Sequence, residues 1–226
     1  MIVYGKQVFF YILQKHKHLI NELYLAKELD KKLFQSISKE GFKIQKLDFK
    51  KAQALAKNGN HQGFLMDIKE YEFTDFNSLK KANFLALLFG ISDVGNIGAI
   101  ARSAYAFGVD GLIILAKNLS MSAVVRTSAG CALDMKISLV TDAMAVINEL
   151  KQEGFGIYSS AKEGVSVKDV RLCEKKLLIM GSEGFGLPNK ILKKSDEILS
   201  IKMINDFDSL NVSAAFAILC DRIVND

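Results

Sequence analysis

Cysteine, histidine and long apolar runs are scarce in this chain of 226 residues. Its three cysteines, Cys131, Cys173 and Cys220, are widely spaced and odd in number, which argues against a disulfide framework or a zinc site. No apolar stretch approaches the roughly 18 residues that a membrane span needs, and the opening residues lack the charged-then-apolar pattern of a signal peptide. We therefore expect a cytoplasmic protein with no bound metal and no membrane span.

The three histidines all lie within the first 82 residues. The rest of the chain therefore has no histidine that could activate a serine, and Ser182 lacks the flanking glycines of a nucleophile elbow. A serine hydrolase built on the second part of the chain is excluded on these grounds.

Positive charge is concentrated in the N-terminal third. Residues 1–82 hold 15 Lys and no Arg against 9 acidic residues, a net charge of +6, whereas residues 83–226 hold 15 Lys and Arg against 16 acidic residues, a net charge of −1. This asymmetry is typical of a segment that meets a polyanion such as RNA. On charge alone, a lysine-rich surface exposed to solvent explains it equally well.

The alternation of apolar and polar residues predicts a small α/β unit over residues 1–68, followed by a charged linker at 69–82. Expected helices span 8–13, 31–40 and 49–57, and expected strands span 22–26, 43–47 and 63–66.

From residue 83 to 226 the expected strands alternate with helices, the pattern of a parallel sheet covered by helices. Expected strands span 84–89, 111–115, 136–140, 156–159, 176–180 and 198–203. Expected helices span about 97–107, 142–152, 188–194 and 210–224. The whole chain is thus predicted to be an α/β protein, with a parallel sheet in its second part.

Three polar or glycine-rich segments follow strands in this second part, where ligands bind in open α/β sheets. The first, residues 90–102, resembles neither a P-loop nor a dinucleotide fingerprint, because Asn96-Ile97 stands where Lys-Ser/Thr is required and the glycine spacing differs. Asn96 and Arg102 could project from it towards a ligand. A helix cap and a surface arginine are the structural alternatives.

The second segment, residues 178–188, has three glycines that let the backbone approach a ligand closely, and Glu183 is its one charged group. In the third, residues 201–213, Ser209 and Asn211 precede the last expected helix. Taken singly, Glu183 could be a turn carboxylate, and the other two could be helix caps.

In their order and combination, these segments resemble the three motifs of the SpoU/TrmH family, within the SPOUT superfamily of methyltransferases. The Asp-x-x-Asn-x-Gly-Ala-x-x-Arg core of the first motif is matched by Asp93, Asn96, Gly98, Ala99 and Arg102. The second motif is matched from Gly181 to Leu187, and Ser-Leu-Asn-Val-Ser of the third from Ser209 to Ser213.

The chain also carries Gly5-x-x-Val8 and His61-Gln62-Gly63, which resemble the subgroup with a ribosomal-protein-like N-terminal domain. It departs from the family pattern at two places. Lys202 replaces a proline of the third motif, and Val94-Gly95 replaces a Pro-His pair of the first.

The resemblance implies an enzyme that transfers a methyl group from S-adenosylmethionine to a ribose 2'-hydroxyl of RNA. It implies a SPOUT domain with a C-terminal trefoil knot at residues 83–226, an RNA-binding domain at 1–68 and a homodimer whose catalytic site draws on both subunits. The cofactor-binding residues that it implies are Gly181, Ile201, Met203 and Leu210. The catalytic residues that it implies are Arg102, Asn96, Glu183, Ser209 and Asn211.

The role of Arg102 and the identity of the RNA stay open at this point. The family proposal makes Arg102 the base, but a guanidinium stays protonated, so holding a phosphate or stabilising alkoxide charge is an equally physical role. The N-terminal domain favours a guanosine of large-subunit rRNA, with tRNA as the second candidate. A non-catalytic RNA-binding ribosome-assembly factor is the alternative from another class, and Lys202 is the feature that favours it.

Overall fold

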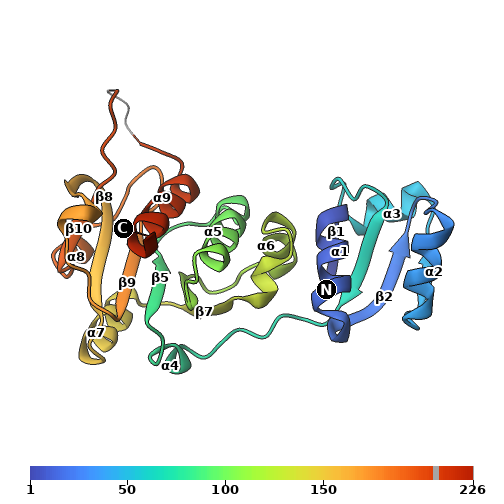
Figure 1. Cartoon of the computed structure of the whole chain (residues 1–226), viewed down its shortest axis with the longest axis horizontal. Helices are drawn as coiled ribbons and strands as arrows, with labels where there is room; N and C mark the ends of the chain where they lie inside the picture. Colours follow the sequence, from blue (N-terminus) through green and yellow to red (C-terminus); the bar gives the residue numbers. More distant parts are fainter. Residues whose placement is uncertain (206–208, 226) are drawn as a thin grey trace. The chain divides into compact units, whose positions relative to one another are not determined.

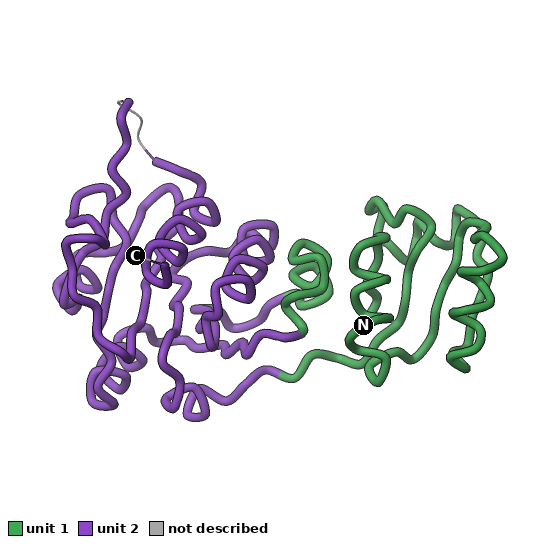
Figure 2. Tube along the Cα trace, in the orientation of Figure 1, with its two compact units in different colours: residues 1–72, 120–133 green, residues 73–119, 134–226 purple. Residues whose placement is uncertain are grey.

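The computed structural model describes residues 1–205 and 209–225. The chain divides into two compact units (Figure 2). Unit 1 comprises residues 1–72 and 120–133, and unit 2 comprises residues 73–119 and 134–226. Among the described residues, no helix is both long enough and apolar enough to cross a bilayer.

Unit 1 contains a four-stranded sheet in the order β1-β4-β2-β3. β4 runs antiparallel to β1 and β2, and β3 runs parallel to β2. The strands are β1 (Ile2–Tyr4), β2 (Ile20–Leu25), β3 (Ile44–Lys46) and β4 (Phe64–Ile68). The α-helices of this unit are α1 (Lys6–Lys15), α2 (Lys31–Lys39), α3 (Phe49–Leu55) and α6 (Met121–Thr127).

Alternation along β4 gives unit 1 two apolar layers, because neighbouring side chains of a strand point to opposite faces. Phe64 packs against Phe9 of α1, with ring centroids 5.0 Å apart. Leu65 faces the other way and packs with Ala52 and Ala56 at α3. The carboxylates of Asp30 and Asp48 cap α2 and α3 by accepting backbone N–H bonds, as expected for Asp at an N-cap.

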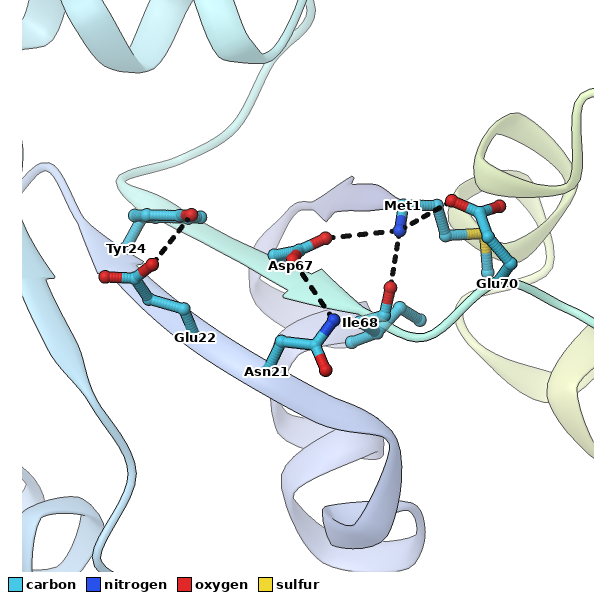
Figure 3. Close-up of polar contacts among 7 residues, drawn as sticks. All are labelled: Met1, Asn21, Glu22, Tyr24, Asp67, Ile68 and Glu70. Atoms are coloured by element: carbon cyan, nitrogen blue, oxygen red, sulfur yellow. Dashed lines mark hydrogen bonds and ion pairs between the residues drawn. The ribbon is translucent and has the colours of Figure 1, made fainter.

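The N-terminal edge of this sheet is closed by polar contacts (Figure 3). The Met1 ammonium pairs with Asp67 at 3.1 Å and Glu70 at 2.9 Å and donates to the Ile68 carbonyl. Asn21 donates to the second oxygen of Asp67 at 3.1 Å. Burial opposes the charged amine, but the two carboxylates outweigh it and raise the pKa of the Met1 amino group.

In the described part of unit 2, six strands form one sheet in the order β10-β8-β9-β5-β6-β7, with every neighbouring pair parallel. The strands are β5 (Phe84–Leu88), β6 (Gly111–Leu115), β7 (Lys136–Val140), β8 (Gly156–Val165), β9 (Lys176–Met180) and β10 (Glu197–Leu199). The α-helices are α4 (Phe76–Leu79), α5 (Val94–Ala106), α7 (Ala143–Gln152), α8 (Asn189–Leu192) and α9 (Val212–Asn225). Short 3₁₀ turns lie at Lys17–Leu19, Cys131–Asp134 and Val167–Asp169.

One face of this sheet carries a continuous apolar core with α4, α7 and α8. Leu85 and Leu87 of β5 lie in that core, so the alternate residues Ala86 and Leu88 point to the opposite face. α5 contacts β6 and packs along α9 (Figure 1). This arrangement confirms the predicted α/β fold with a parallel sheet in the second part.

Two strand predictions in unit 2 were wrong in extent. The strand expected at 198–203 ends at Leu199, and β8 continues to Val165 instead of stopping at Ser159. Ser200 donates its N–H to the Val165 carbonyl, where β8 ends. Residues 201–203 therefore have no neighbouring strand to pair with.

Besides the short 3₁₀ turns, one strand and two α-helices of the described chain were not predicted: β1, α4 and α6. α4 lies within the stretch expected to be a linker, and its Leu79 is buried in the core of unit 2.

Candidate active site

The polar segments of the second part come together at one edge of the unit 2 sheet. β5 and β9 are neighbouring parallel strands, so the loops that follow Leu88 and Met180 leave the sheet at the same edge. The first of these loops leads into α5 and the second begins at Gly181. Residues 209–211 reach the same place just before α9 begins.

Three side chains from these segments form one hydrogen-bonded cluster. The amide of Asn211 donates to Glu183 Oε1 at 2.6 Å and to Asn96 Oδ1 at 2.9 Å. The amide of Asn96 donates to the same Glu183 oxygen at 3.2 Å. Since the three residues lie up to 115 positions apart in the chain, the cluster ties three distant segments together.

The cluster also caps the N-terminus of α9. Asn211 Oδ1 accepts the N–H of Ser213 at 2.9 Å, and Glu183 Oε1 accepts the N–H of Val212 at 3.2 Å. The capping alternative for Asn211 is therefore confirmed, and this residue caps the helix while bridging two other loops. The cap of α5 is Asp93, which accepts the Asn96 N–H at 2.7 Å, so the side chain of Asn96 is free to join the cluster.

Gly181 is required by the shape of the second loop. A Cβ at this position would lie 2.5 Å from the carbonyl carbon of Gly186 and 2.8 Å from the nitrogen of Leu187. The loop folds back on itself here, with a bridge between Ser182 and Gly186, whose φ is +61°. A Cβ at Gly184, by contrast, would meet nothing within 4 Å.

A pocket of about 240 Å³ opens beside this loop. All four residues predicted to bind the cofactor line it: Gly181, Ile201, Met203 and Leu210. Glu183 and Ser209 line it as well. The rest of the wall is mostly aliphatic side chain and backbone, with Lys162 as its one basic group among the described residues.

The sequence did not reveal the part of the wall contributed by residues 160–162. They belong to the end of β8, which lies between β9 and β10 in the sheet. The signal that could have found them is the length of β8, since a strand continued past Ser159 reaches the pocket edge.

Arg102 does not join the other predicted catalytic residues within one chain. It is exposed, it does not line the pocket, and no described residue bonds to its guanidinium. It follows Asn96 by six positions, which on an ideal helix is about 9 Å along the axis and about 120° around it. A single chain therefore brings together Asn96, Glu183 and Asn211, but leaves Arg102 apart.

Lys202 does not line the pocket either. It lines an adjacent, more open hollow that shares Lys162, Ile201 and Met203 with the pocket wall. Within residues 1–205 and 209–225, no group of three His, Cys, Asp or Glu side chains could hold a metal ion.

A parallel α/β sheet with a glycine-rich ligand pocket at its carboxyl edge defines a class of small-ligand-binding proteins. Within that class, the chain belongs to the SpoU rRNA methylase family, whose family model matches residues 83–221. A second model, described as RNA 2'-O ribose methyltransferase substrate binding, matches residues 2–74. The predicted resemblance is confirmed.

Two relatives match most of the chain in sequence. An uncharacterized tRNA/rRNA methyltransferase of Borreliella burgdorferi is 33% identical over 221 residues, which cover 90% of this chain and 97% of the relative. A Staphylococcus aureus protein, described provisionally as a TrmH family tRNA/rRNA methyltransferase, is 32% identical over 216 residues, covering 90% of this chain and 82% of the relative.

Solved structures share the fold, and two of them contain a bound cofactor. One is the SpoU methyltransferase AviRb of Streptomyces viridochromogenes in complex with AdoMet, with a TM-score of 0.79 and 21% identity over 99% of this chain and 89% of that one. The other is the AdoMet-bound rRNA methyltransferase of Sinorhizobium meliloti, with a TM-score of 0.78 and 20% identity over 98% of this chain and 85% of that one.

Proposed function

We propose that this protein transfers the methyl group of S-adenosylmethionine to a ribose 2'-hydroxyl of RNA. Family membership supports RNA methylation in general, and the substrate-binding model that matches residues 2–74 supports the ribose as the acceptor. The observation that carries the proposal is the pocket beside the Asn96–Glu183–Asn211 cluster, which unites all three motif segments.

The wall of the pocket fits S-adenosylmethionine. Met180, Ile201 and Leu210 offer aliphatic surface to a neutral purine ring, and the backbone at Gly181 is accessible because no side chain covers it. Both AdoMet complexes named above share the fold of this chain. The cofactor supplies the methyl group on an electrophilic sulfonium.

The residues of the chain then have to hold the acceptor oxygen in line with that methyl group, an effect worth up to about 7–11 kcal/mol. Glu183, Asn96 and Asn211 hold one another in fixed positions, and Ser209 stands at the pocket wall. We assign Arg102 to stabilising the negative charge that develops on the 2'-oxygen, because a guanidinium group donates hydrogen bonds and has no lone pair to accept one.

The position of Arg102 supports a homodimer as part of the same proposal. Arg102 is exposed and does not line the pocket of its own chain, and a second copy could present it there. Co-expressing Arg102→Ala with Gly181→Ala tests this, because a mixed dimer would contain one intact site. We expect about a quarter of wild-type activity from the mixture, whereas no recovery would contradict a shared site. The trefoil knot stays a prediction.

For the acceptor we propose a guanosine of large-subunit rRNA. The basic N-terminal unit supports a polyanionic substrate such as rRNA. A tRNA is the second candidate, because the sequence relatives are described as tRNA/rRNA methyltransferases. The non-catalytic alternative loses its main support, since Lys202 lies outside the pocket wall.

Transfer of labelled methyl from S-adenosylmethionine to total RNA of a strain that lacks this protein tests the proposal. After alkaline hydrolysis, label at a 2'-oxygen stays in resistant dinucleotides, because the hydroxyl that attacks the phosphate is blocked. We expect resistant label in the rRNA fraction. Label released as mononucleotides would show base methylation and contradict the ribose, and absence of label together with absence of cofactor binding by calorimetry would contradict the enzyme.

A further inference from the structure

Unit 1 contains a hollow that the proposed methyl transfer does not use. It has a volume of about 470 Å³ and is formed by the end of β2, by α3 and by the loop 58–63 that leads into β4. In the described chain, no carboxylate lines it. Its aromatic, basic and amide groups are Lys27, Phe49, Gln53, Asn58, Asn60, His61 and Gln62.

Phe49 is the unusual member of this wall. Its side chain is 70% exposed, whereas Phe9 and Phe64 of the same unit are 1% exposed. The ring rests against His61, with centroids 5.6 Å apart, so one part of it is supported and the rest is bare. A supported but exposed ring is the arrangement on which unpaired bases stack in proteins that bind single-stranded RNA.

The loop beside Phe49 is held in a conformation that most residues avoid. Asn58 and Gln62 have φ of +63° and +55°, in the left-handed region. The Gln62 side chain accepts the Lys6 N–H at 2.9 Å, and the buried His61 accepts the Gly63 N–H through Nδ1 at 3.0 Å. The loop is therefore fixed before any ligand arrives.

The free amides of the hollow suit the edge of a base. The side chains of Asn58 and Asn60 are exposed, and no other described residue bonds to them. An amide offers both a donor and an acceptor, which matches the donor and acceptor atoms of a nucleobase. The hollow thus offers the ring of Phe49 to the face of a base and the amides of Asn58 and Asn60 to its edge.

The charge around the hollow is positive. Lys27 lines it, with its ammonium 4.5 Å from the centroid of the Phe64 ring. Lys50 and Lys57 are exposed on and just after α3. Unit 1 as a whole carries 14 Lys and Arg against 8 acidic residues, a net charge of +6. Phosphates that flank a bound base would thus meet cations.

We propose that this hollow binds an unpaired nucleobase of the substrate RNA, which stacks on Phe49 and is read by the amides of Asn58 and Asn60. The assignment deepens the proposed function and rests on it, because the RNA is the methyl acceptor. The unit would thereby select RNA that presents a loop or a bulge, in addition to attracting any polyanion.

Binding of a short fluorescein-labelled single-stranded RNA to the full chain, followed by anisotropy, tests the proposal. Phe49→Ala should weaken binding by about 5- to 100-fold, the range for loss of one stacked base, with an unchanged salt dependence because no phosphate contact is removed. Phe34→Ala, an exposed phenylalanine elsewhere in the unit, is the matched control and should bind normally. A blunt RNA duplex should bind both variants equally.

The absence of tryptophan from the chain gives a second, independent readout. Phe49→Trp restores a stacking ring and introduces the sole indole, whose fluorescence a stacked base quenches. We expect single-stranded RNA to quench Phe49→Trp strongly and Phe34→Trp little. Equal quenching of the two, or full RNA affinity of Phe49→Ala, would overturn the proposal.

These results separate the hollow from the methyl transfer. If the wild type methylates RNA and Phe49→Ala binds single strands normally, the hollow is not a base site and the proposed function stands. If no methyl is transferred but RNA quenches Phe49→Trp alone, the base site stands and the proposed function falls.

Discussion

The pocket of unit 2 is lined by backbone atoms and aliphatic side chains, whereas the hollow of unit 1 is lined by an exposed ring and side-chain amides. Their surroundings differ in charge too. Unit 2 carries 16 Lys and Arg against 17 acidic residues, a net charge of −1, and unit 1 has a net charge of +6. The first suits a small cofactor that needs little charge from the protein, and the second suits a polyanion.

The two places are also held rigid by different means. In unit 2, the side chains of Asn96, Glu183 and Asn211 tie together segments that are far apart in sequence. In unit 1, a single loop is fixed by left-handed residues and by local bonds such as that from Gly63 to His61. We infer that cofactor binding depends on long-range folding of unit 2, whereas base binding depends on one local loop.

The largest effect expected is that of Arg102→Ala. Loss of a group that stabilises charge in the transition state costs about 10²–10³-fold in rate, so methyl transfer should fall by that factor. Cofactor affinity by calorimetry should be unchanged, because the proposed role of Arg102 is to stabilise charge on the acceptor oxygen and not to hold the cofactor. Methylation at a near-normal rate would remove Arg102 from the chemistry.

Gly181→Ala and Gly184→Ala form a matched pair that tests whether the close packing of the backbone at Gly181 is needed for cofactor binding. The first places a Cβ 2.5 Å from backbone that cannot move away easily, and the second places one in open space. We expect Gly181→Ala to lose about tenfold or more in affinity for S-adenosylmethionine, because relief of a clash that costs about 1–3 kcal/mol displaces the loop that lines the pocket. Gly184→Ala should bind the cofactor as the wild type does, and equal losses would show that the loop has another shape.

Neutralising lysines in each unit tests whether RNA binding depends on the positive charge of unit 1. Lys50→Gln with Lys57→Gln removes two cations near the hollow and should lower the slope of log affinity for single-stranded RNA against log salt by about 1.4. Lys190→Gln with Lys193→Gln removes two exposed cations at α8 of unit 2 and should leave the slope as it is. The same slope change in both pairs would mean that the basic unit has no special part in RNA binding.

The smallest effect concerns the stability of the Glu183 cluster. Glu183→Ala removes the acceptor of the Asn96 amide and of the Val212 N–H, and one of the two acceptors of the Asn211 amide, at a cost of about 1 kcal/mol for groups that water partly reaches. The melting temperature of unit 2 should fall by about 2–4 °C. Glu183→Gln keeps one acceptor oxygen and should melt close to the wild type. An unchanged melting temperature for Glu183→Ala would show that the cluster does not hold the loops.

Much of the unit 2 sheet could be predicted because most of its strands are rich in aliphatic residues. The strands at 111–115, 136–140 and 176–180 have the bounds predicted for them. The strand expected at 198–203 failed beyond Leu199, because Ile201 and Met203 alternate like strand residues but line the pocket. Alternation indicates that one side is buried and does not say whether a sheet or a ligand site buries it.

The candidate site could be predicted in part. The motifs indicated that Asn96, Glu183 and Asn211 belong together, and the structure joins them by hydrogen bonds. The contribution of Lys162 could not be predicted, because it depends on β8 lying between β9 and β10, an order that local sequence does not encode. The hollow at Phe49 was not predicted either, because a single phenylalanine in a sequence is expected to lie in the core, and only the structure shows that it is exposed.

The central claim is that one chain holds a cofactor pocket and a separate site for an RNA base. Titrating S-adenosylmethionine and single-stranded RNA in turn into Gly181→Ala and into Phe49→Ala tests it most directly. We expect Gly181→Ala to lose the cofactor and keep the RNA, and Phe49→Ala to lose the RNA and keep the cofactor. If either variant lost both ligands, or if Phe49→Ala kept both, the claim of two separate sites would be contradicted.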